Sequence, residues 1–144
     1  AMNALRLEKS FGVWSAEFTQ DRTPGMTGMD RWIDWSRDNF IGHEAASKER
    51  SGGDVPQQLV TLEIDADDAD ASGYEPIWQN DKRVGFVTSG GYGHYTAKSL
   101  AMGLLDTGVN EEDGPLMVDV VGKRRTARTL TEAAWDPKGV RIRL

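Results

Sequence analysis

The chain has 144 residues, a formal net charge of −6 and a sequence pI near 4.9. This length fits one sizeable hydrophobic core, or one small domain with an appended piece. The acidic balance argues against a nucleic-acid-binding protein, because phosphate contacts need a positive face. Cysteine is absent, which excludes disulfides and thiol chemistry. No apolar stretch approaches the roughly 18 residues of a membrane span. We therefore expect a soluble, cytoplasmic protein with neither nucleic-acid nor membrane partners.

The first third of the chain is expected to combine short helices with one strand. A helix is predicted at residues 3–10, where the pattern ends at Phe11 and Gly12. Alternation at residues 29–37 predicts a strand with Trp32 or Ile33 pointing inward. A second helix is predicted at residues 44–50, ended by two glycines. This part of the chain therefore has a predicted α+β character.

One linker-like segment, at residues 51–54, places the predicted domain boundary between residues 53 and 54. Beyond it, apolar and polar residues alternate in short runs that are separated by turn residues. Strands are expected near residues 60–64, 76–78, 84–87, 100–104, 116–120 and 126–130. The predicted fold class is therefore mainly β: a six-stranded antiparallel Greek-key or jelly-roll-like barrel at residues 54–144, preceded by the α+β segment at residues 1–53.

Residues 84–94 have the most unusual composition, because an alternating apolar run enters a cluster of Thr, Ser and Gly. We expect a strand, a tightly constrained turn and another strand. The glycine backbone there takes positive φ or passes too close to another group for a Cβ. The spacing fits neither a dinucleotide fingerprint nor a phosphate-binding loop. His94 has the chemistry of an acid, a base or a metal ligand. A structural turn residue is favoured, because His43 is the only other histidine.

Two charged segments have simple interpretations. The acidic run at residues 65–72 lacks the glycine and glutamate of an EF-hand loop, since Asp70 and Pro76 stand at those positions. A solvated acidic loop is therefore favoured over a calcium site. The basic run at residues 123–125, with Arg128, is interpreted as a solvated strand face rather than a phosphate site.

Four segments carry a resemblance to a known family. They are LRLEKSFGVW at residues 5–14, DNFIGHEA at 38–45, VGFVTSGGYGH at 84–94 with KSLA at 98–101, and AAWDPKGVRIR at 133–143. Together they resemble the C-terminal part of the aminomethyltransferase (glycine cleavage T-protein) family. The greatest similarity is to the folate-binding C-terminal portion of dimethylglycine and sarcosine dehydrogenases. Ser10 and His43 depart from the glycine and arginine that are usual in these motifs.

The resemblance implies a domain organisation and a folate site. Residues 1–53 become the C-terminal remnant of the folate-binding domain, and residues 54–144 become the C-terminal barrel domain. From the residues alone Glu8 would be an exposed helix residue paired with Lys9 or Arg6. The resemblance instead makes Glu8 the ligand of the pterin ring of tetrahydrofolate. A carboxylate suits this role, because it accepts two parallel hydrogen bonds from a 2-amino group and a ring N–H.

Three further residues belong to the implied folate site. Trp14 follows the segment that contains Glu8. A barrel that only docks a partner would not need this segment together with Trp14. Arg37 is the nearest candidate for a contact with the folate glutamyl tail. Trp135, near the C-terminus, either reaches the folate site or packs on the barrel. No metal ligand is assigned. No catalytic residue is assigned either, because the family's catalytic aspartate lies in the larger N-terminal region.

The implied function belongs to a larger parent protein. It transfers a one-carbon unit from an N-methylated or aminomethyl donor to tetrahydrofolate and forms 5,10-methylenetetrahydrofolate. In a dehydrogenase-type parent an upstream FAD domain oxidises the amine. The chain alone is expected to be inactive and to need the missing N-terminal region as its partner. The alternatives are a non-catalytic structural or docking barrel, or the glycine cleavage T-protein or sulfonium demethylase branch of the same family.

Overall fold

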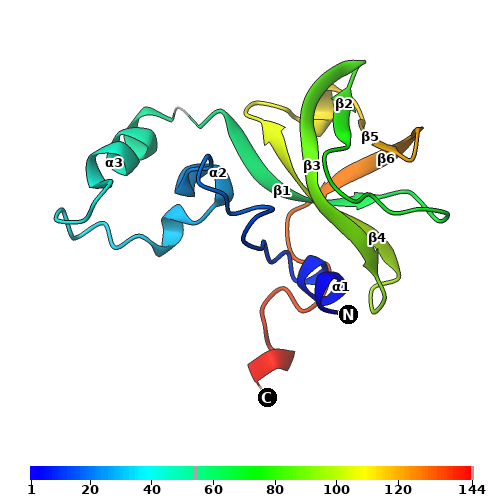
Figure 1. Cartoon of the computed structure of the whole chain (residues 1–144), viewed down its shortest axis with the longest axis horizontal. Coiled ribbons are helices and arrows are strands. Elements are labelled where there is room, and N and C mark those ends of the chain that lie inside the picture. Colours follow the sequence, from blue (N-terminus) through cyan, green and yellow to red (C-terminus); the bar gives the residue numbers. More distant parts are fainter. Residues whose placement is uncertain (54, 144) are drawn as a thin grey trace.

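The computed structural model describes residues 1–53 and 55–143 (Figure 1). Asp54, the first residue of the predicted barrel domain, and Leu144 lie outside the described residues. A β-barrel occupies one part of the molecule, and a helical extension containing α2 and α3 projects away from it (Figure 1). Helix α1 lies against the barrel beside β3 and β4, and the C-terminal segment runs past the same helix.

The barrel consists of six strands in the order β1-β4-β3-β2-β5-β6, and it closes by pairing β6 with β1. All six pairings are antiparallel. The strands are β1 (Gln57–Ile64), β2 (Pro76–Gln79), β3 (Lys82–Gly93), β4 (Lys98–Asp106), β5 (Leu116–Val120) and β6 (Lys123–Leu130). The predicted six-stranded antiparallel barrel is confirmed. Closure gives every strand of the barrel a neighbour on both sides, which disfavours edge-to-edge association.

The barrel interior is filled by the side chains that strand alternation points inward. Leu62 and Ile64 of β1 are fully buried there, and Val60 packs against them, so the predicted common face of this strand is confirmed. Ile77, Val87 and other buried apolar residues complete the core. Burying such side chains supplies most of the stabilisation of a small barrel.

The glycine-rich segment lies inside a strand and not in a turn. β3 continues through the glycines to Gly93, and the turn to β4 is formed by the next four residues, 94–97. The predicted hairpin is therefore correct, but the predicted position of its turn is wrong. A Cβ on Gly90 would lie 2.3 Å from the carbonyl oxygen of Ala71, which is too close for any side chain. The glycine is needed there because another backbone segment crosses the strand.

The N-terminal part of the chain contains helices and short helical turns. They are α1 (Met2–Glu8), α2 (Pro24–Thr27), η1 (Asp30–Trp32) and α3 (His43–Gly52), and the barrel region adds η2 (Glu111–Asp113) and η3 (Arg141–Arg143). Both predicted helices are therefore present, with ends shifted by one or two residues. None of the helices in residues 1–53 and 55–143 combines the length and the apolar character that a membrane crossing requires.

The strand predicted at residues 29–37 is wrong. This segment forms η1 and a following turn, and Trp32 is 73% exposed. Local hydrogen bonds account for the difference: the indole N–H of Trp35 donates to the carbonyl of Asp30, and the backbone N–H and hydroxyl of Ser36 donate to Asp34. Such side-chain to backbone bonds compete with sheet formation. The α+β character expected for residues 1–53 is accordingly replaced by helices and turns.

Helix α1 is fixed to the outside of the barrel by one apolar residue. Leu7 is fully buried and packs with Leu100 and Met102 of β4. This contact is separate from the core inside the barrel. It places the next residue, Glu8, beside the turn between β3 and β4.

Candidate functional site

Glu8 lies at the end of α1, and only 2% of its surface is exposed. One carboxylate oxygen, Oε1, accepts three hydrogen bonds from the β3–β4 turn. The backbone N–H of Tyr95 donates at 2.8 Å, the N–H of Thr96 at 2.9 Å, and the Thr96 hydroxyl at 3.1 Å. The expectation from the residues alone, an exposed Glu8 paired with Lys9 or Arg6, is therefore wrong.

The second carboxylate oxygen of Glu8, Oε2, is not held by the turn. Within the described residues Oε2 accepts no hydrogen bond, yet it is not among the fully buried polar atoms that lack a partner. It therefore retains contact with the space next to it. A carboxylate oxygen with free acceptor capacity can receive a donor from a ligand, and a charged acceptor makes a strong hydrogen bond.

The pocket beside Glu8 has a volume of about 610 Å³ and is mostly apolar. Its walls come from α1, the loop after α1, the β3–β4 turn and the C-terminal segment. The lining residues are Met2, Leu5, Arg6, Glu8, Lys9, Phe11, Tyr95, Trp135 and Ile142. An apolar and aromatic wall with a few polar groups is typical of sites for flat organic ligands.

The C-terminal segment is tied to α1 at this pocket. The backbone N–H of Trp135 donates to the carbonyl of Glu8 at 2.9 Å. The Lys9 ammonium lies 3.6 Å from the carboxylate of Asp136 and 5.3 Å from the centre of the Trp135 ring. Burial alone would raise the pKa of Asp136, but the backbone N–H groups of Arg141 and Val140 and the Lys9 charge outweigh it, so this pKa lies below its usual value.

Two of the four predicted site residues meet in this pocket, and two lie elsewhere. Glu8 and Trp135 both line the pocket. Trp14 is 81% exposed and packs edge-on against Phe18 at 6.2 Å. Arg37 is exposed in the loop before α3, within the extension that projects from the barrel (Figure 1). Trp14 and Arg37 stay predictions.

A family comparison agrees with the architecture. The profile described as "Glycine cleavage T-protein C-terminal barrel domain" matches residues 57–136, more than half of the 144 residues. The chain belongs to this family. The matched residues include all six strands of the T-protein barrel and extend through Trp135.

Similar proteins are much longer than this chain. Human mitochondrial dimethylglycine dehydrogenase is 36% identical over 145 residues, which cover 100% of this chain and 17% of that protein. An aminomethyltransferase of Desulfitobacterium hafniense (strain DSM 10664 / DCB-2) is 31% identical, over 96% of this chain and 38% of that protein. The crystal structure of the glycine cleavage system aminomethyltransferase T from Bartonella henselae superposes with a TM-score of 0.79 at 22% identity, over 92% of this chain and 37% of that one. The last likeness shows that the fold is shared.

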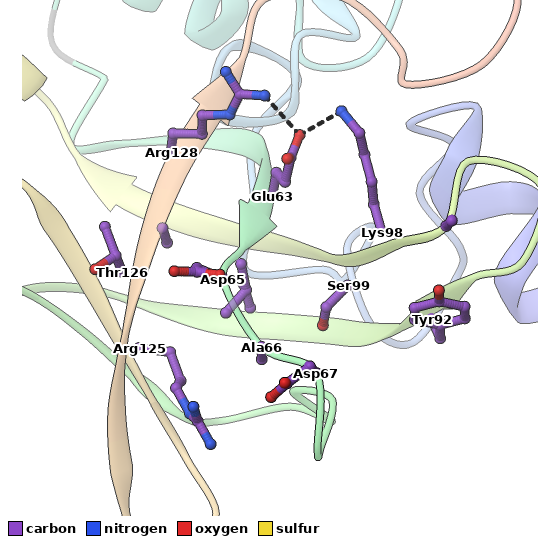
Figure 2. Close-up of a pocket in the computed structure, with 13 residues that line it drawn as sticks. Glu63, Asp65, Ala66, Asp67, Tyr92, Lys98, Ser99, Arg125, Thr126 and Arg128 are labelled. Carbon is purple, nitrogen blue, oxygen red and sulfur yellow. Dashed lines mark hydrogen bonds and ion pairs between the residues drawn. The ribbon is translucent and has the colours of Figure 1, made fainter.

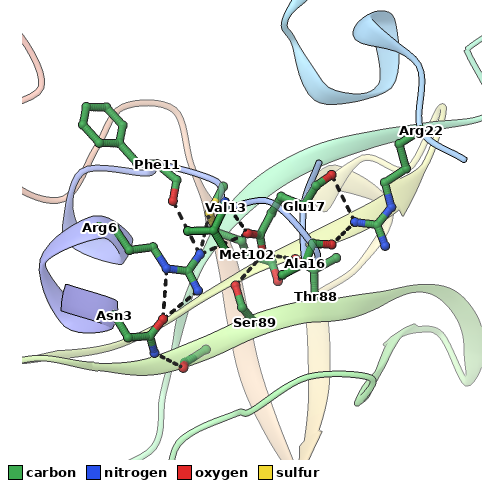
Figure 3. Close-up of polar contacts among 11 residues, drawn as sticks. Asn3, Arg6, Phe11, Val13, Ala16, Glu17, Arg22, Thr88, Ser89 and Met102 are labelled. Carbon is green, nitrogen blue, oxygen red and sulfur yellow. Dashed lines mark hydrogen bonds and ion pairs between the residues drawn. The ribbon is translucent and has the colours of Figure 1, made fainter. Parts of the chain in front are cut away.

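A buried carboxylate that the sequence did not reveal holds the loop after α1 on the T-protein barrel (Figure 3). Glu17 is fully buried and accepts hydrogen bonds from Arg6 at 3.2 Å, from the Val13 N–H at 2.9 Å, and from the hydroxyls of Thr88 and Ser89. Its partners are separated from it by up to 72 residues. No local spacing could have identified this contact.

A second pocket, of about 640 Å³, lies where β1, β4 and β6 meet (Figure 2). Lys98 and Arg128 both donate to the same oxygen of Glu63, at 2.7 and 3.0 Å. Burial alone would raise the pKa of Glu63, but the hydrogen bonds and charges of Lys98 and Arg128 outweigh it and hold this pKa below its usual value. Lys98 and Arg128 of the T-protein barrel are thus already engaged with a carboxylate.

The acidic loop before β2 also contacts the barrel. Asp68 forms ion pairs with Lys123 and Arg125, and the hydroxyl of Ser99 donates to Asp70 at 2.7 Å. Two acids of this loop therefore bind barrel residues, and both stay exposed to solvent, in keeping with the solvated acidic loop that the sequence predicted. His94 packs edge-on against Tyr92 at 5.2 Å and is exposed, which agrees with a structural position in the turn.

Proposed function

We propose that this chain forms one wall of a tetrahydrofolate site in a larger protein of this family, with Glu8 as the ligand of the pterin ring. One observation carries the proposal: Glu8 is nearly buried, one of its oxygens is held by the β3–β4 turn, and the residue lines an apolar and aromatic pocket. The family match and the aminomethyltransferase and dimethylglycine dehydrogenase relatives support a folate ligand.

The residues of the pocket fit a pterin. A pterin has flat apolar faces and an edge that carries a 2-amino group and a ring N–H. The rings of Phe11, Tyr95 and Trp135 suit the faces, and the Glu8 carboxylate suits the donor edge. Because Oε1 already accepts three hydrogen bonds, we expect Oε2 to receive the donors of the ligand.

The proposed parent is a dimethylglycine or sarcosine dehydrogenase. Bound folate supplies the nitrogen that accepts the one-carbon unit, which yields 5,10-methylenetetrahydrofolate. In this chain Glu8 and Trp135 bind and orient the ring, Trp14 contributes to the same site in the whole protein, and Arg37 contacts the glutamyl tail. The catalytic aspartate and the FAD domain belong to the missing N-terminal region, so the chain alone is proposed to be inactive. A parent from the T-protein or the sulfonium demethylase branch would use the same folate site with another one-carbon donor.

One observation favours the rival function, a non-catalytic docking barrel. Trp14, Trp32 and Ile41 are 81%, 73% and 106% exposed. Exposed apolar side chains of this size are available to contact another protein or another part of the same protein. A docking barrel, however, gives no role to the nearly buried Glu8 that lines an apolar and aromatic pocket. The missing N-terminal region is the proposed partner of these side chains under both functions.

Isothermal calorimetry with folinic acid, a stable reduced folate, tests the proposal. Wild type is compared with Glu8→Gln, which keeps the shape and one acceptor oxygen, and with Glu44→Gln, which makes the same change at an exposed position of α3. We expect measurable binding by wild type and Glu44→Gln, and at least about tenfold weaker binding by Glu8→Gln. Equal binding by all three proteins, or no binding by wild type, would overturn the assignment of Glu8 in this chain.

A further inference from the structure

The geometry points to Thr96 as a positioning residue of the proposed folate site. Its hydroxyl and backbone N–H hold one oxygen of Glu8, which leaves the other oxygen for a donor of the ligand in the pocket that Glu8 lines. The inference rests on the proposed function and extends it to a residue that carries no family motif. Thr96 acts through Glu8 and does not line the pocket itself.

Thr96 supplies two of the three hydrogen bonds that Oε1 of Glu8 accepts, from its N–H at 2.9 Å and from its hydroxyl at 3.1 Å. The same hydroxyl lies 3.4 Å from the carbonyl of Gly93. A hydroxyl has one hydrogen, so it donates to only one of these two acceptors at a time. The carboxylate is the nearer and the charged acceptor, and a charged acceptor makes the stronger bond.

The close approach of Glu8 to the turn is built into the backbone. A Cβ on Gly93 would lie 2.9 Å from Oε1 of Glu8 and 2.7 Å from the Thr96 hydroxyl. A Cβ there would force the Glu8 or the Thr96 side chain to shift. The turn and the carboxylate therefore fit one another closely.

The orientation of the carboxylate decides which donors it can accept. The last torsion of a glutamate side chain is broad, so the carboxylate plane rotates easily unless it is held. Three donors on Oε1 fix this plane. With the Thr96 hydroxyl removed, the plane gains freedom, and the bond between Oε2 and a 2-amino group of the ligand is weakened.

The test compares Thr96→Val, which keeps the shape of the side chain and removes the hydroxyl, with Thr96→Ser, which keeps the hydroxyl. Calorimetry on the 144-residue chain measures the affinity for folinic acid and for its analogue without the 2-amino group. We expect Thr96→Val to bind folinic acid roughly fivefold more weakly and the analogue almost unchanged, so that the ratio of the two affinities falls. Thr96→Ser should retain the wild-type ratio. Circular dichroism and thermal unfolding check that both variants are folded.

Each outcome separates the inference from the function it rests on. If Thr96→Val binds both ligands like wild type while Glu8→Gln loses binding, the role of Thr96 is overturned and the folate wall stands. If Thr96→Val weakens both ligands equally, Thr96 has a general structural role and the inference is again overturned. If wild type binds neither ligand, the proposed function of this chain fails, and the inference fails with it.

Discussion

The carbonyl of Glu8 accepts a hydrogen bond of 2.9 Å from the backbone N–H of Trp135. This bond joins the end of α1 to the segment that follows the last barrel strand. It brings two residues from opposite ends of the sequence to one pocket. The barrel is thus the frame on which the two chain ends assemble a site.

The Trp135 ring should contribute to binding through its aromatic face. We expect Trp135→Ala to weaken folinic acid binding roughly fivefold, about 1 kcal/mol, and Trp135→Phe to retain most of the affinity. Trp32→Ala is the matched control, because Trp32 is 73% exposed and lies outside this pocket. Calorimetry under the same conditions measures all three. Unchanged affinity in Trp135→Ala would assign this residue to packing on the barrel.

Glu17 should be a major contributor to stability. Glu17→Ala removes the acceptor of Arg6, Thr88 and Ser89 and leaves a nearly buried cation without its main partner. We expect the free energy of unfolding in urea to fall by about 3 kcal/mol. Glu132→Ala, at an exposed position, should change it by less than about 0.5 kcal/mol. A loss below about 1 kcal/mol in Glu17→Ala would contradict this role.

The Glu63 cluster should make stability depend on pH in a defined direction. The pKa of Glu63 is lower in the folded protein than its ordinary value of 4.5. Its ion pairs with Lys98 and Arg128 therefore stabilise the fold fully above pH 4.5, and this contribution is lost as the pH falls through the lowered pKa.

Glu63→Gln tests this direction. The variant should be less stable than wild type at pH 7, and the difference should shrink as the pH is lowered below 4.5. Urea unfolding at a series of pH values measures it. A difference that stays constant or grows toward low pH would show that the carboxylate charge is not the cause.

Gly90 should not tolerate a side chain. Gly90→Ala places a methyl group 2.3 Å from the carbonyl of Ala71, so we expect a destabilisation of about 1–3 kcal/mol. Gly52→Ala is the control, because a Cβ at this helical position meets open space. It should be neutral or stabilise by about 0.4–1 kcal/mol. Thermal unfolding measures the melting temperatures of both variants. Equal melting temperatures would refute the close contact between Gly90 and the carbonyl of Ala71.

Local patterns predicted the barrel strands, each of which has partners to pair with and one face in the core. Alternation at Val60, Leu62 and Ile64 identified β1, because a barrel strand has one buried face. The same rule failed at residues 29–37, with which no strand of the described residues pairs, and local hydrogen bonds form turns there instead. The glycines of β3 were noticed, but the crossing at Ala71 that requires one of them could not be foreseen.

The site was predicted less completely than the fold. The family resemblance selected Glu8 and Trp135, and the structure places both in one pocket. Thr96 and Glu17 were missed, because their partners are 88 and up to 72 residues away and no spacing rule spans such separations. Burial and hydrogen-bond satisfaction of a carboxylate are properties of the folded chain.

The most direct test of the folate wall is a ¹H–¹⁵N correlation spectrum of the chain during titration with folinic acid. The account predicts that the backbone signals of Tyr95 and Thr96 and the indole signal of Trp135 move together with one saturation curve, while the indole signal of exposed Trp32 stays in place. Saturation that moves only signals of the α2–α3 extension, or no movement at all at millimolar ligand, would contradict the assignment of the site to Glu8 and its pocket.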